Sequence, residues 1–346
     1  MYSFKNDYSE SVHHNILTAI SALGLKQNDC YGMDDYCAVA KEMILTAIDS
    51  KDAEIHFLPG GTITNLTLIA HILRPYQAVI SANTAHINIH ETGAIEASGH
   101  KILDIITPDG KLTPELIKPI LEQHENEHWV QPKMVFISNP TEIGTIYSKQ
   151  EIENLYTYCQ EQGLLLYLDG ARLAMGLTAQ DSDLKLTDLP KLVDAFYIGG
   201  TKVGALFGEA LVLINDKLKA DFRFTMKQRG SIMAKGWLLG IQFKELFTDN
   251  LYLKLGEHTN EMAALLQEII AEQGFSFLVK PQSNQLFPIL PNWLIAEISK
   301  HYLISTWSKI DADNTCVRFC TSWATKKEEI LEFKEFLKQA VTNTKP

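Results

Sequence analysis

One lysine stands alone in a long run of small and apolar residues. Lys202 lies in the middle of "DAFYIGGTKVGALFGEALVLIN", residues 194–215. Burial of an ammonium group is costly, so a lysine in such a place is paired with an anion, has a lowered pKa or reacts covalently. A lowered pKa makes lysine a nucleophile. The alternative is that the ammonium reaches solvent or a nearby acid and has no special chemistry.

Two other polar groups also follow apolar runs that are typical of strands. Asp169 ends "GLLLYLD", and a carboxylate in that position requires a cationic or hydrogen-bonded partner. Arg172 follows closely, so a structural Asp–Arg pair is one interpretation. Gly60, Gly61 and Thr62 follow "AEIHFLP" and precede an expected helix, whose first N–H groups can bind a phosphate. Ordinary helix capping by Thr62 is the alternative there.

Together these three features have the chemistry that pyridoxal phosphate requires. The cofactor needs an anchored phosphate, an anion that keeps its ring nitrogen protonated, and an amine that can bond to its aldehyde. In parallel α/β sheets, ligands bind at the carboxyl ends of the strands, which is where these residues fall. The sequence therefore predicts a pyridoxal-phosphate site in which Lys202 is the reactive amine.

The elements that must position these residues alternate between strands and helices. Short apolar runs predict strands at "AEIHFLP", "QAVISA", "HKILDI", "KMVFIS", "GLLLYLD" and "AFYIGG". Uniformly apolar strands are typical of a sheet that is covered on both faces. Helices of crossover length are expected at "TITNLTLIAHIL", "TPELIKPILEQHE" and "SKQEIENLYTYCQEQG". This pattern predicts an α/β layered domain over residues 15–240.

The C-terminal part of the chain has a different pattern. A long helix is expected at "NLYLKLGEHTNEMAALLQEIIAEQG", and a small sheet with a closing helix from "FSFLV", "NQLFPIL" and "TCVRFCTSW" onward. We therefore expect a second, smaller domain over residues 241–346. Residues 1–14 form a separate N-terminal segment in this interpretation.

Composition limits the classes of partner. Acidic residues outnumber basic ones by 42 to 31, which gives a net charge of −11 and argues against nucleic acid and anionic membranes as partners. The start of the chain lacks the apolar core of a signal peptide, and no run of about 18 apolar residues occurs. Five cysteines without a close CxxC pair indicate a reducing compartment. We expect a soluble, cytoplasmic protein.

Two motifs contain residue types that bind metals, but their spacing does not match a metal site. "CVRFC" lies in an alternating, strand-like run without a nearby histidine cluster, so buried thiols on a strand are the simpler interpretation. "HINIHE" places His86 and His90 four residues apart, but the alternation of isoleucine is strand-like or irregular, and the HExxH pattern is absent. No metal is predicted.

Six segments of the chain resemble a known family. They are "YSESVHHNIL", "YGMDDY", "LPGGTITN", "HINIHETGAIEASGH", "LYLDGARLAMGL" and "GGTKVGALFGEALV". In this order they look like the threonine aldolase and β-eliminating lyase group of fold-type-I pyridoxal-phosphate enzymes, over most of the chain. The resemblance implies a three-layer large domain with a mostly parallel sheet and a small C-terminal α+β domain.

The same resemblance implies roles for the residues that hold the cofactor. Lys202 would bond to the cofactor aldehyde, and Asp169 would pair with the pyridine nitrogen. His86 would stack on the ring and is also the candidate base, because imidazole titrates near neutrality. Gly61 and Thr62 would hold the phosphate with help from Lys227.

Further residues are implied to bind the substrate. Arg172, which also lies among the cofactor contacts, and Arg318 of "CVRFC" would receive the substrate carboxylate, for which the planar guanidinium fork is suited. Asp7 and Tyr31 fall in segments that this family places near the active site, often across a subunit boundary. A homodimer or homotetramer is therefore expected.

The activity implied is the cleavage of a β-hydroxy-α-amino acid to glycine and an aldehyde. One departure concerns the substrate: many threonine aldolases have Asn-Thr-His after the strand that matches "KMVFIS", whereas this chain has "SNPTEIGTIYS". Thr141 stands in the place of that histidine, and Glu142 follows it. Threonine, allo-threonine and phenylserine-like substrates all stay open, as do β-elimination from an aromatic amino acid and a catalytically silent cofactor-binding protein.

Overall fold

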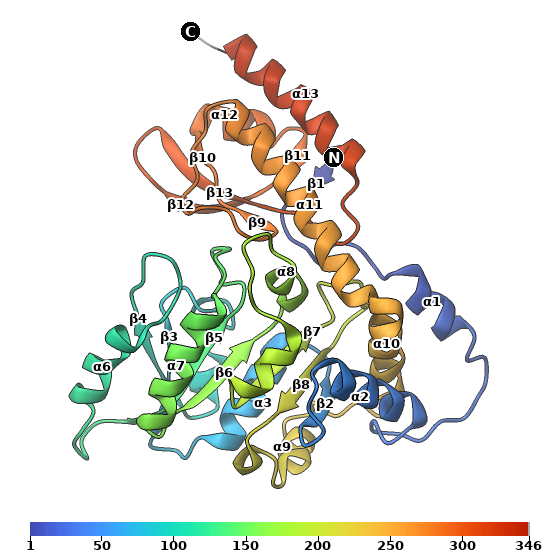
Figure 1. Cartoon of the computed structure of the whole chain (residues 1–346). Helices are drawn as coiled ribbons and strands as arrows, with labels where there is room; N and C mark the ends of the chain where they lie inside the picture. The colour runs from blue at the N-terminus through green and yellow to red at the C-terminus, as the bar shows by residue number, and fades with distance from the viewer. Residues whose placement is uncertain (345–346) are drawn as a thin grey trace.

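A sheet of seven strands forms the centre of the computed structural model, which describes residues 1–344 (Figure 1). Its strand order is β2-β8-β7-β6-β5-β3-β4. Pairing is parallel from β4 through β3, β5 and β6 to β7, whereas β8 runs antiparallel to both β7 and β2. The strands are β2 (Glu54–Leu58), β3 (Gln77–Ala82), β4 (Lys101–Ile105), β5 (Gln131–Ser138), β6 (Leu165–Asp169), β7 (Ala195–Gly199) and β8 (Glu209–Leu213). The sheet is thus mostly parallel.

Alternate residues of each strand enter two apolar cores, one on either face of the sheet. In β5, Val135 and Ile137 belong to one core and Met134 and Phe136 to the other. The first core is closed by α2 (Asp35–Ala47), α6 (Pro114–Gln123), α7 (Lys149–Glu161), α8 (Leu173–Leu177) and α10 (Trp237–Phe247). The second is closed by α3 (Gly61–Ile72), α4 (His86–Ile89), α5 (Ala94–Ala97) and α9 (Phe222–Gln228). This is a three-layer α/β arrangement.

A smaller sheet and its helices contain a third core. The strands are β9 (Gln285–Leu286), β10 (Ile289–Pro291), β12 (Ser305–Lys309) and β13 (Asn314–Cys320). Each of the first three pairs antiparallel with β13. The helices are α11 (Leu251–Glu272), α12 (Asn292–Ile298) and α13 (Lys327–Thr344). The N-terminal β1 (Tyr2–Ser3) pairs with β11 (Tyr302–Leu303), so the first residues of the chain lie on this part, and Phe4 is buried in its core.

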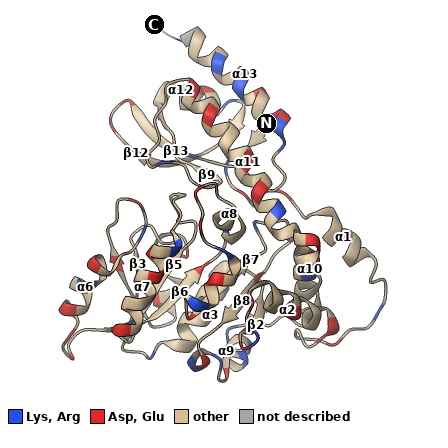
Figure 2. Ribbon diagram, viewed as in Figure 1, with Lys and Arg blue, Asp and Glu red and all other residues tan. Residues whose placement is uncertain are grey.

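The remaining helices lie at connections. The α-helix α1 (His14–Ser21) projects at the side of the molecule before a long connection to α2 (Figure 1). Short 3-10 helices occur at η1 (Leu186–Lys191), η2 (Asp216–Leu218) and η3 (Thr248–Asn250). Figure 2 shows that charged residues lie mainly on helices and connections rather than in the middle of the large sheet. Within residues 1–344, no helix is long and apolar enough to cross a membrane.

Four local expectations differ from the structure. His86–Ile89 forms one helical turn and is not strand-like. Helix α3 has Gly60 rather than a threonine as its N-cap. The run "FSFLV" forms an isolated bridge between Phe277 and Pro288 rather than a strand. Strand β8, the antiparallel partner of β7, lies in the second half of the long apolar run around Lys202, where the sequence pattern predicts no separate strand.

The expected boundary at residue 240 falls inside α10, which packs on the first core. Helix α11 contributes Tyr252 and Leu255 to that core and Met262 and Leu266 to the third core. We therefore propose that the division between the large and small domains lies within α11.

Candidate active site

A cavity of about 300 Å³ opens where β5, β6 and β7 end and α3 begins. It brings together segments that are far apart in the sequence. Its lining residues are Tyr8, Pro59, Gly60, Gly61, Thr62, His86, Ser138, Pro140, Glu142, Asp169, Ala171, Arg172, Tyr197, Thr201, Lys202, Phe207 and Glu209. The cavity contains both a lysine and several carboxyl groups, and is therefore the candidate active site.

Lys202 extends from the loop after β7 into this cavity. Burial, and then the charge of Arg172, lowers the pKa of its ammonium group. Within residues 1–344 its Nζ atom has no hydrogen bond or ion pair, and lies 5.9 Å from the ring centroid of Tyr8. A partly desolvated amine without a fixed partner is the form that a nucleophilic lysine requires.

Asp169 is the last residue of β6, and its buried carboxylate is held by three donors. The Tyr197 hydroxyl donates to Oδ1 at 2.5 Å and the Ala171 N–H at 2.9 Å, while Asn65 Nδ2 donates to Oδ2 at 3.2 Å. The alternative of a structural Asp169–Arg172 pair is not what the fold contains, because Arg172 is paired elsewhere. Asp169 therefore presents an oriented anion to the cavity.

The N-terminus of α3 forms the opposite wall. Helix α3 is 12 residues long and has no side-chain cap, so the N–H groups of its first turn stay available. Gly60, Gly61 and Thr62 all line the cavity. A Cβ atom on Gly61 would lie 3.2 Å from the Tyr197 hydroxyl, so a side chain here would crowd the wall. Free N–H groups, a hydroxyl and the helix dipole suit a phosphate group.

His86 begins the one-turn helix α4 at the edge of the cavity. Its Nδ1 lies 2.9 Å from Oε1 of the buried Glu91, and its backbone N–H donates to Glu142 Oε1 at 2.9 Å. Glu142 also accepts a 2.6 Å bond from the Ser138 hydroxyl, and burial raises the pKa of its carboxyl group. Two carboxyl groups thus fix the backbone and the ring of one histidine.

Arg172 is held by an N-terminal residue. Its Nε and Nη2 donate to Asp7 at 2.6 and 3.0 Å, and Asn284 Nδ2 donates to the same carboxylate at 2.9 Å. Burial alone would raise the pKa of Asp7, but the charges of Arg172 and Lys202 and these hydrogen bonds lower it to about 2. Asp7 thereby joins the N-terminal segment to both the large and the small sheet regions.

Arg318 does not line the cavity. Its Nη2 donates to the Lys5 carbonyl at 3.3 Å, and its guanidinium lies 6.0 Å from the Trp307 ring centroid. Its Nε is buried and has no hydrogen-bond partner in the described part of the chain. Arg318 therefore has an uncommitted donor near the segment that carries Asp7.

Besides Asp7 and Arg318, three more residues expected at the site do not line this cavity. Lys227 Nζ stacks 4.5 Å from the ring centroid of Tyr31, and both line a separate, open pocket of about 660 Å³. The hydroxyl of Thr141 is buried and lies 2.7 Å from that of Thr145, and Thr141 does not line the cavity. Glu142, one residue further on, lines the cavity in its place.

Several site residues were missed by reasoning from the sequence. Asn65 and Glu91 are polar groups inside apolar windows, in "TITNLTLIA" and "HINIHETGA", and that contrast is a signal for a buried polar network. Glu209 accepts bonds from the Gly200 N–H and the Thr201 hydroxyl, and burial raises its pKa to about 8. Tyr8 and Ser138 gave no such signal, since tyrosine and serine are common at loops.

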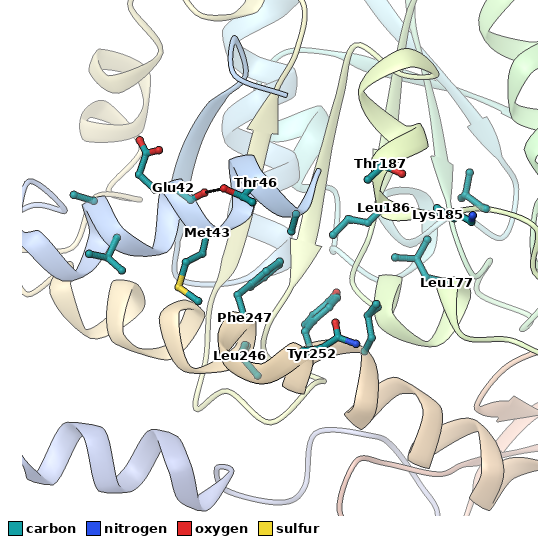
Figure 3. A pocket seen from close by; sticks show the side chains of 16 residues that line it. Glu42, Met43, Thr46, Leu177, Lys185, Leu186, Thr187, Leu246, Phe247 and Tyr252 are labelled. Carbon is teal, nitrogen blue, oxygen red and sulfur yellow. Dashed lines mark hydrogen bonds between the residues drawn. The ribbon is translucent and has the colours of Figure 1, made fainter. Parts of the chain in front are cut away.

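A larger cavity, of about 900 Å³, lies at the side of the large sheet between α2, α8 and α10 (Figure 3). Its wall is mainly apolar, with Met43, Leu186 and Phe247 pointing into it. Glu42 and Lys185 are the charged residues in the wall, and no cluster of reactive groups accompanies them in the described structure. This cavity is therefore not the candidate active site.

Comparison with known proteins agrees with the geometry. Residues 16–291 match the beta-eliminating lyase family. A low specificity L-threonine aldolase of Pseudomonas aeruginosa is 28% identical over 336 residues, 95% of each chain. The solved structure of Leishmania major threonine aldolase is 48% identical with a TM-score of 0.97, covering 99% of this chain and 100% of that one. A Thermus thermophilus aspartate aminotransferase variant, 14% identical over 98% of this chain and 91% of its own, with a TM-score of 0.73, shares only the fold.

Proposed function

Since the chain belongs to the beta-eliminating lyase family, we propose that it is a pyridoxal-phosphate-dependent aldolase. The reaction is the cleavage of the Cα–Cβ bond of a β-hydroxy-α-amino acid, which yields glycine and an aldehyde. The likeness to threonine aldolases of Pseudomonas aeruginosa and Leishmania major supports this choice within the family.

One observation carries the proposal. The cavity combines an amine without a fixed partner at Lys202, an oriented anion at Asp169 and an uncapped helix N-terminus at Gly60. These are the three groups that can hold pyridoxal phosphate by its aldehyde, its ring nitrogen and its phosphate. When bound, the cofactor supplies an electron sink for the Cα bond that lies perpendicular to its ring.

The other residues of the cavity bind and orient the substrate in this proposal. Arg172 and Arg318 bind its carboxylate, Arg172 with a guanidinium that Asp7 holds in place and Arg318 with its free Nε. His86 takes the β-hydroxyl proton at its Nε2 atom, the ring nitrogen that faces away from Glu91. Tyr8, which is exposed and close to Lys202, covers the mouth of the cavity and limits the access of water.

The substrate is an amino acid with a small or aromatic group at Cβ, namely threonine, allo-threonine or a phenylserine-like compound. Because Thr141 does not line the cavity, the group that follows β5 into the cavity is the carboxyl of Glu142 rather than the imidazole of many threonine aldolases. Glu142 therefore replaces a histidine as the polar group on that wall. A carboxyl that holds its proton can donate a hydrogen bond to a substrate oxygen.

The assembly is proposed to be at least a dimer. Lys227, Tyr31 and Arg223 form an exposed cationic and aromatic patch, with the Arg223 guanidinium donating to the Tyr31 carbonyl at 3.2 Å. Phe224 and Met33 in the same pocket are exposed apolar side chains. Such a patch is suited to lie at a subunit interface, where Lys227 and Tyr31 would reach the cavity of a second copy.

The test is a product analysis with a panel of substrates. The purified protein with pyridoxal phosphate is incubated with threonine, allo-threonine, phenylserine and tyrosine. Glycine and the matching aldehyde should form from at least one hydroxy amino acid, without ammonia. Keto acid and ammonia from tyrosine, with no glycine from any hydroxy amino acid, would instead establish a β-eliminating lyase. Lys202→Ala serves as the control for reactions that the free cofactor catalyses.

A further inference from the structure

Glu91 is a fully buried acid beside the candidate active site, and no step of the proposed reaction uses it directly. None of its side chain is exposed to solvent. Its Oε1 lies 2.9 Å from His86 Nδ1 and 2.8 Å from Asn65 Nδ2. Its Oε2 is buried and has no hydrogen-bond partner within residues 1–344. A buried charge of this kind is costly unless a positive partner forms beside it.

The orientation of Asn65 indicates where the protons of this network lie. The Tyr167 hydroxyl donates to Asn65 Oδ1 at 2.8 Å, so the amide NH₂ group must face the other way. That NH₂ group contacts Glu91 Oε1 at 2.8 Å and Asp169 Oδ2 at 3.2 Å. One amide therefore bridges two carboxylates, and both act as acceptors.

The proton between His86 and Glu91 belongs to the imidazole. Glu91 Oε1 already accepts from Asn65, so the simplest assignment is that His86 Nδ1–H donates the second bond to a carboxylate. A proton on Glu91 Oε2 would be a buried donor without an acceptor in the described structure. With Nδ1 protonated, Nε2 of a neutral imidazole has a free lone pair and can accept a proton.

We propose that Glu91 is the positioning residue of the active site, which holds His86 as the Nδ1–H tautomer and stabilises its protonated form. This inference rests on the proposed function, because the proton that reaches Nε2 is that of the substrate β-hydroxyl group. The hydroxyl O–H bond breaks and the Nε2–H bond forms, and the positive imidazolium then lies against the Glu91 anion. Asn65 extends the network to Asp169, so the base and the ring-nitrogen anion share one hydrogen-bonded unit.

The backbone around His86 supports a positioning role for Glu91. The His86 N–H donates to Glu142 Oε1, which fixes the start of α4. Two groups then limit rotation of the ring about its side-chain bonds: the hydrogen bond to Glu91 and the ring of His90, whose centroid lies 5.4 Å away. Of these two, only Glu91 bonds to a ring nitrogen, so its loss would leave the tautomer undetermined and the ring orientation less restricted.

The first experiment reads the tautomer without any turnover. The full chain is labelled with ¹⁵N-histidine, and long-range ¹H–¹⁵N spectra are recorded near pH 7.5 with pyridoxal phosphate present. The chain has 11 histidines, so His86→Asn identifies the His86 signals. We expect a protonated Nδ1 and an unprotonated Nε2 in the wild type and in Glu91→Gln, and a mixed state in Glu91→Ala. A protonated Nε2 in the wild type would overturn the proposal.

The second experiment is a double-mutant cycle on the rate of glycine formation. Glu91→Ala should lower kcat about 10²-fold, as expected for a base that has lost its positioning, with KM changed less than about 3-fold. Because Glu91 acts through His86, the same change in the His86→Asn background should cost less than about 3-fold. Glu91→Gln keeps the acceptor but loses the charge, so an intermediate loss of about 10-fold is expected.

The control is Glu96→Gln, the same chemical change at an exposed position five residues further on. It should leave kcat within about 2-fold of the wild-type value. The positioning role would be refuted if Glu91→Ala lowered kcat by the same factor in the wild-type and His86→Asn backgrounds. It would also be refuted if Glu96→Gln lowered kcat as much as Glu91→Ala does. The absence of glycine in the wild type would count against the proposed function, whereas the tautomer measurement would still test Glu91.

Discussion

The buried pair of Asp7 and Arg172 gives a prediction whose size follows from the structure. Asp7 is fully buried and accepts two hydrogen bonds from Arg172 and one from Asn284. Its pKa is lowered from 3.8 to about 2. A difference of nearly two pKa units between the folded and unfolded states corresponds to about 2 kcal/mol of folding free energy.

The substitution Asp7→Asn removes this charge and leaves a buried guanidinium without an anion. Removal of one partner from a buried ion pair costs about 3–5 kcal/mol. Asparagine keeps one hydrogen-bond acceptor for Arg172, so we expect the free energy of unfolding to fall by about 3 kcal/mol at pH 7, at the lower end of that range. The loss in the free energy of unfolding should exceed the roughly 2 kcal/mol that follows from the pKa shift of Asp7 alone, because the variant also leaves the charge of Arg172 uncompensated.

The pH dependence has a definite sign. Since the pKa of Asp7 is lower in the folded state, its contribution is fully present above pH 3.8. It is lost progressively as the pH falls towards 2. The difference in the free energy of unfolding between the wild type and Asp7→Asn should therefore be constant between pH 5 and 8, and should decrease below about pH 4.

Urea unfolding of both proteins, followed by tryptophan fluorescence at pH 7, 5, 4 and 3 and at one protein concentration, measures this difference. Asp181→Asn is the control, because Asp181 forms an exposed ion pair with Lys280 and should show no comparable loss. A difference below about 1 kcal/mol at pH 7, or one that does not decrease below pH 4, would refute the reasoning.

Three further predictions concern the cofactor, the base and the assembly. The purified protein should be yellow with pyridoxal phosphate, and borohydride should fix the cofactor on Lys202; a colourless protein in excess cofactor, or a label on Lys227, would contradict this assignment. Lys202→Ala should keep the circular dichroism of the wild type and lose turnover, and unchanged activity would rule out the mechanism. His86→Asn should lower the rate of glycine formation by about 10²-fold or more while the yellow colour stays, and loss of colour would point to a role in holding the cofactor. Sedimentation should give at least a dimer, and Lys227→Ala together with Tyr31→Ala should weaken cofactor binding if these residues reach a second copy; an active monomer would contradict the proposed assembly.

The strands and the residues at their ends could be predicted because apolar runs that end in a single charged residue mark both. Uniformly apolar runs of five or six residues must be buried on both faces, and "QAVISA" coincides with β3 for this reason. The charged residues at the ends of such runs, Asp169 and Lys202, could then be placed at one edge of the sheet. The structure brings them to one cavity with Thr62 and His86.

The rest of the site depends on contacts between distant segments, which local patterns do not contain. Asp7 and Arg172 are 165 positions apart, so nothing in "FKNDYSE" indicates that its aspartate replaces Asp169 as the partner of the arginine. Thr141 and Glu142 are neighbours, and only the turn after β5 decides which of the two faces the cavity. Lys227 and Tyr31 line a separate pocket, and only in the proposed assembly would they complete the site of a second copy.

The carboxyl groups around the cavity differ in the groups that pair with them. Five acids lie in or beside the candidate active site: Asp7, Glu91, Glu142, Asp169 and Glu209. Asp7 is neutralised by Arg172, while Glu91 and Asp169 accept only from N–H and O–H donors.

Glu142 and Glu209 also accept hydrogen bonds from N–H and O–H donors, but their pKa values are raised. Burial raises the pKa of Glu142, and it raises that of Glu209 to about 8, which favours the neutral form of Glu209 near pH 7. Glu209 lines the cavity together with Gly60 and Gly61, so in its neutral form it would not repel a phosphate at the N-terminus of α3, where we propose that the cofactor phosphate binds. The burial that lowers the pKa of Lys202 would therefore also weaken a negative charge that opposes the proposed cofactor.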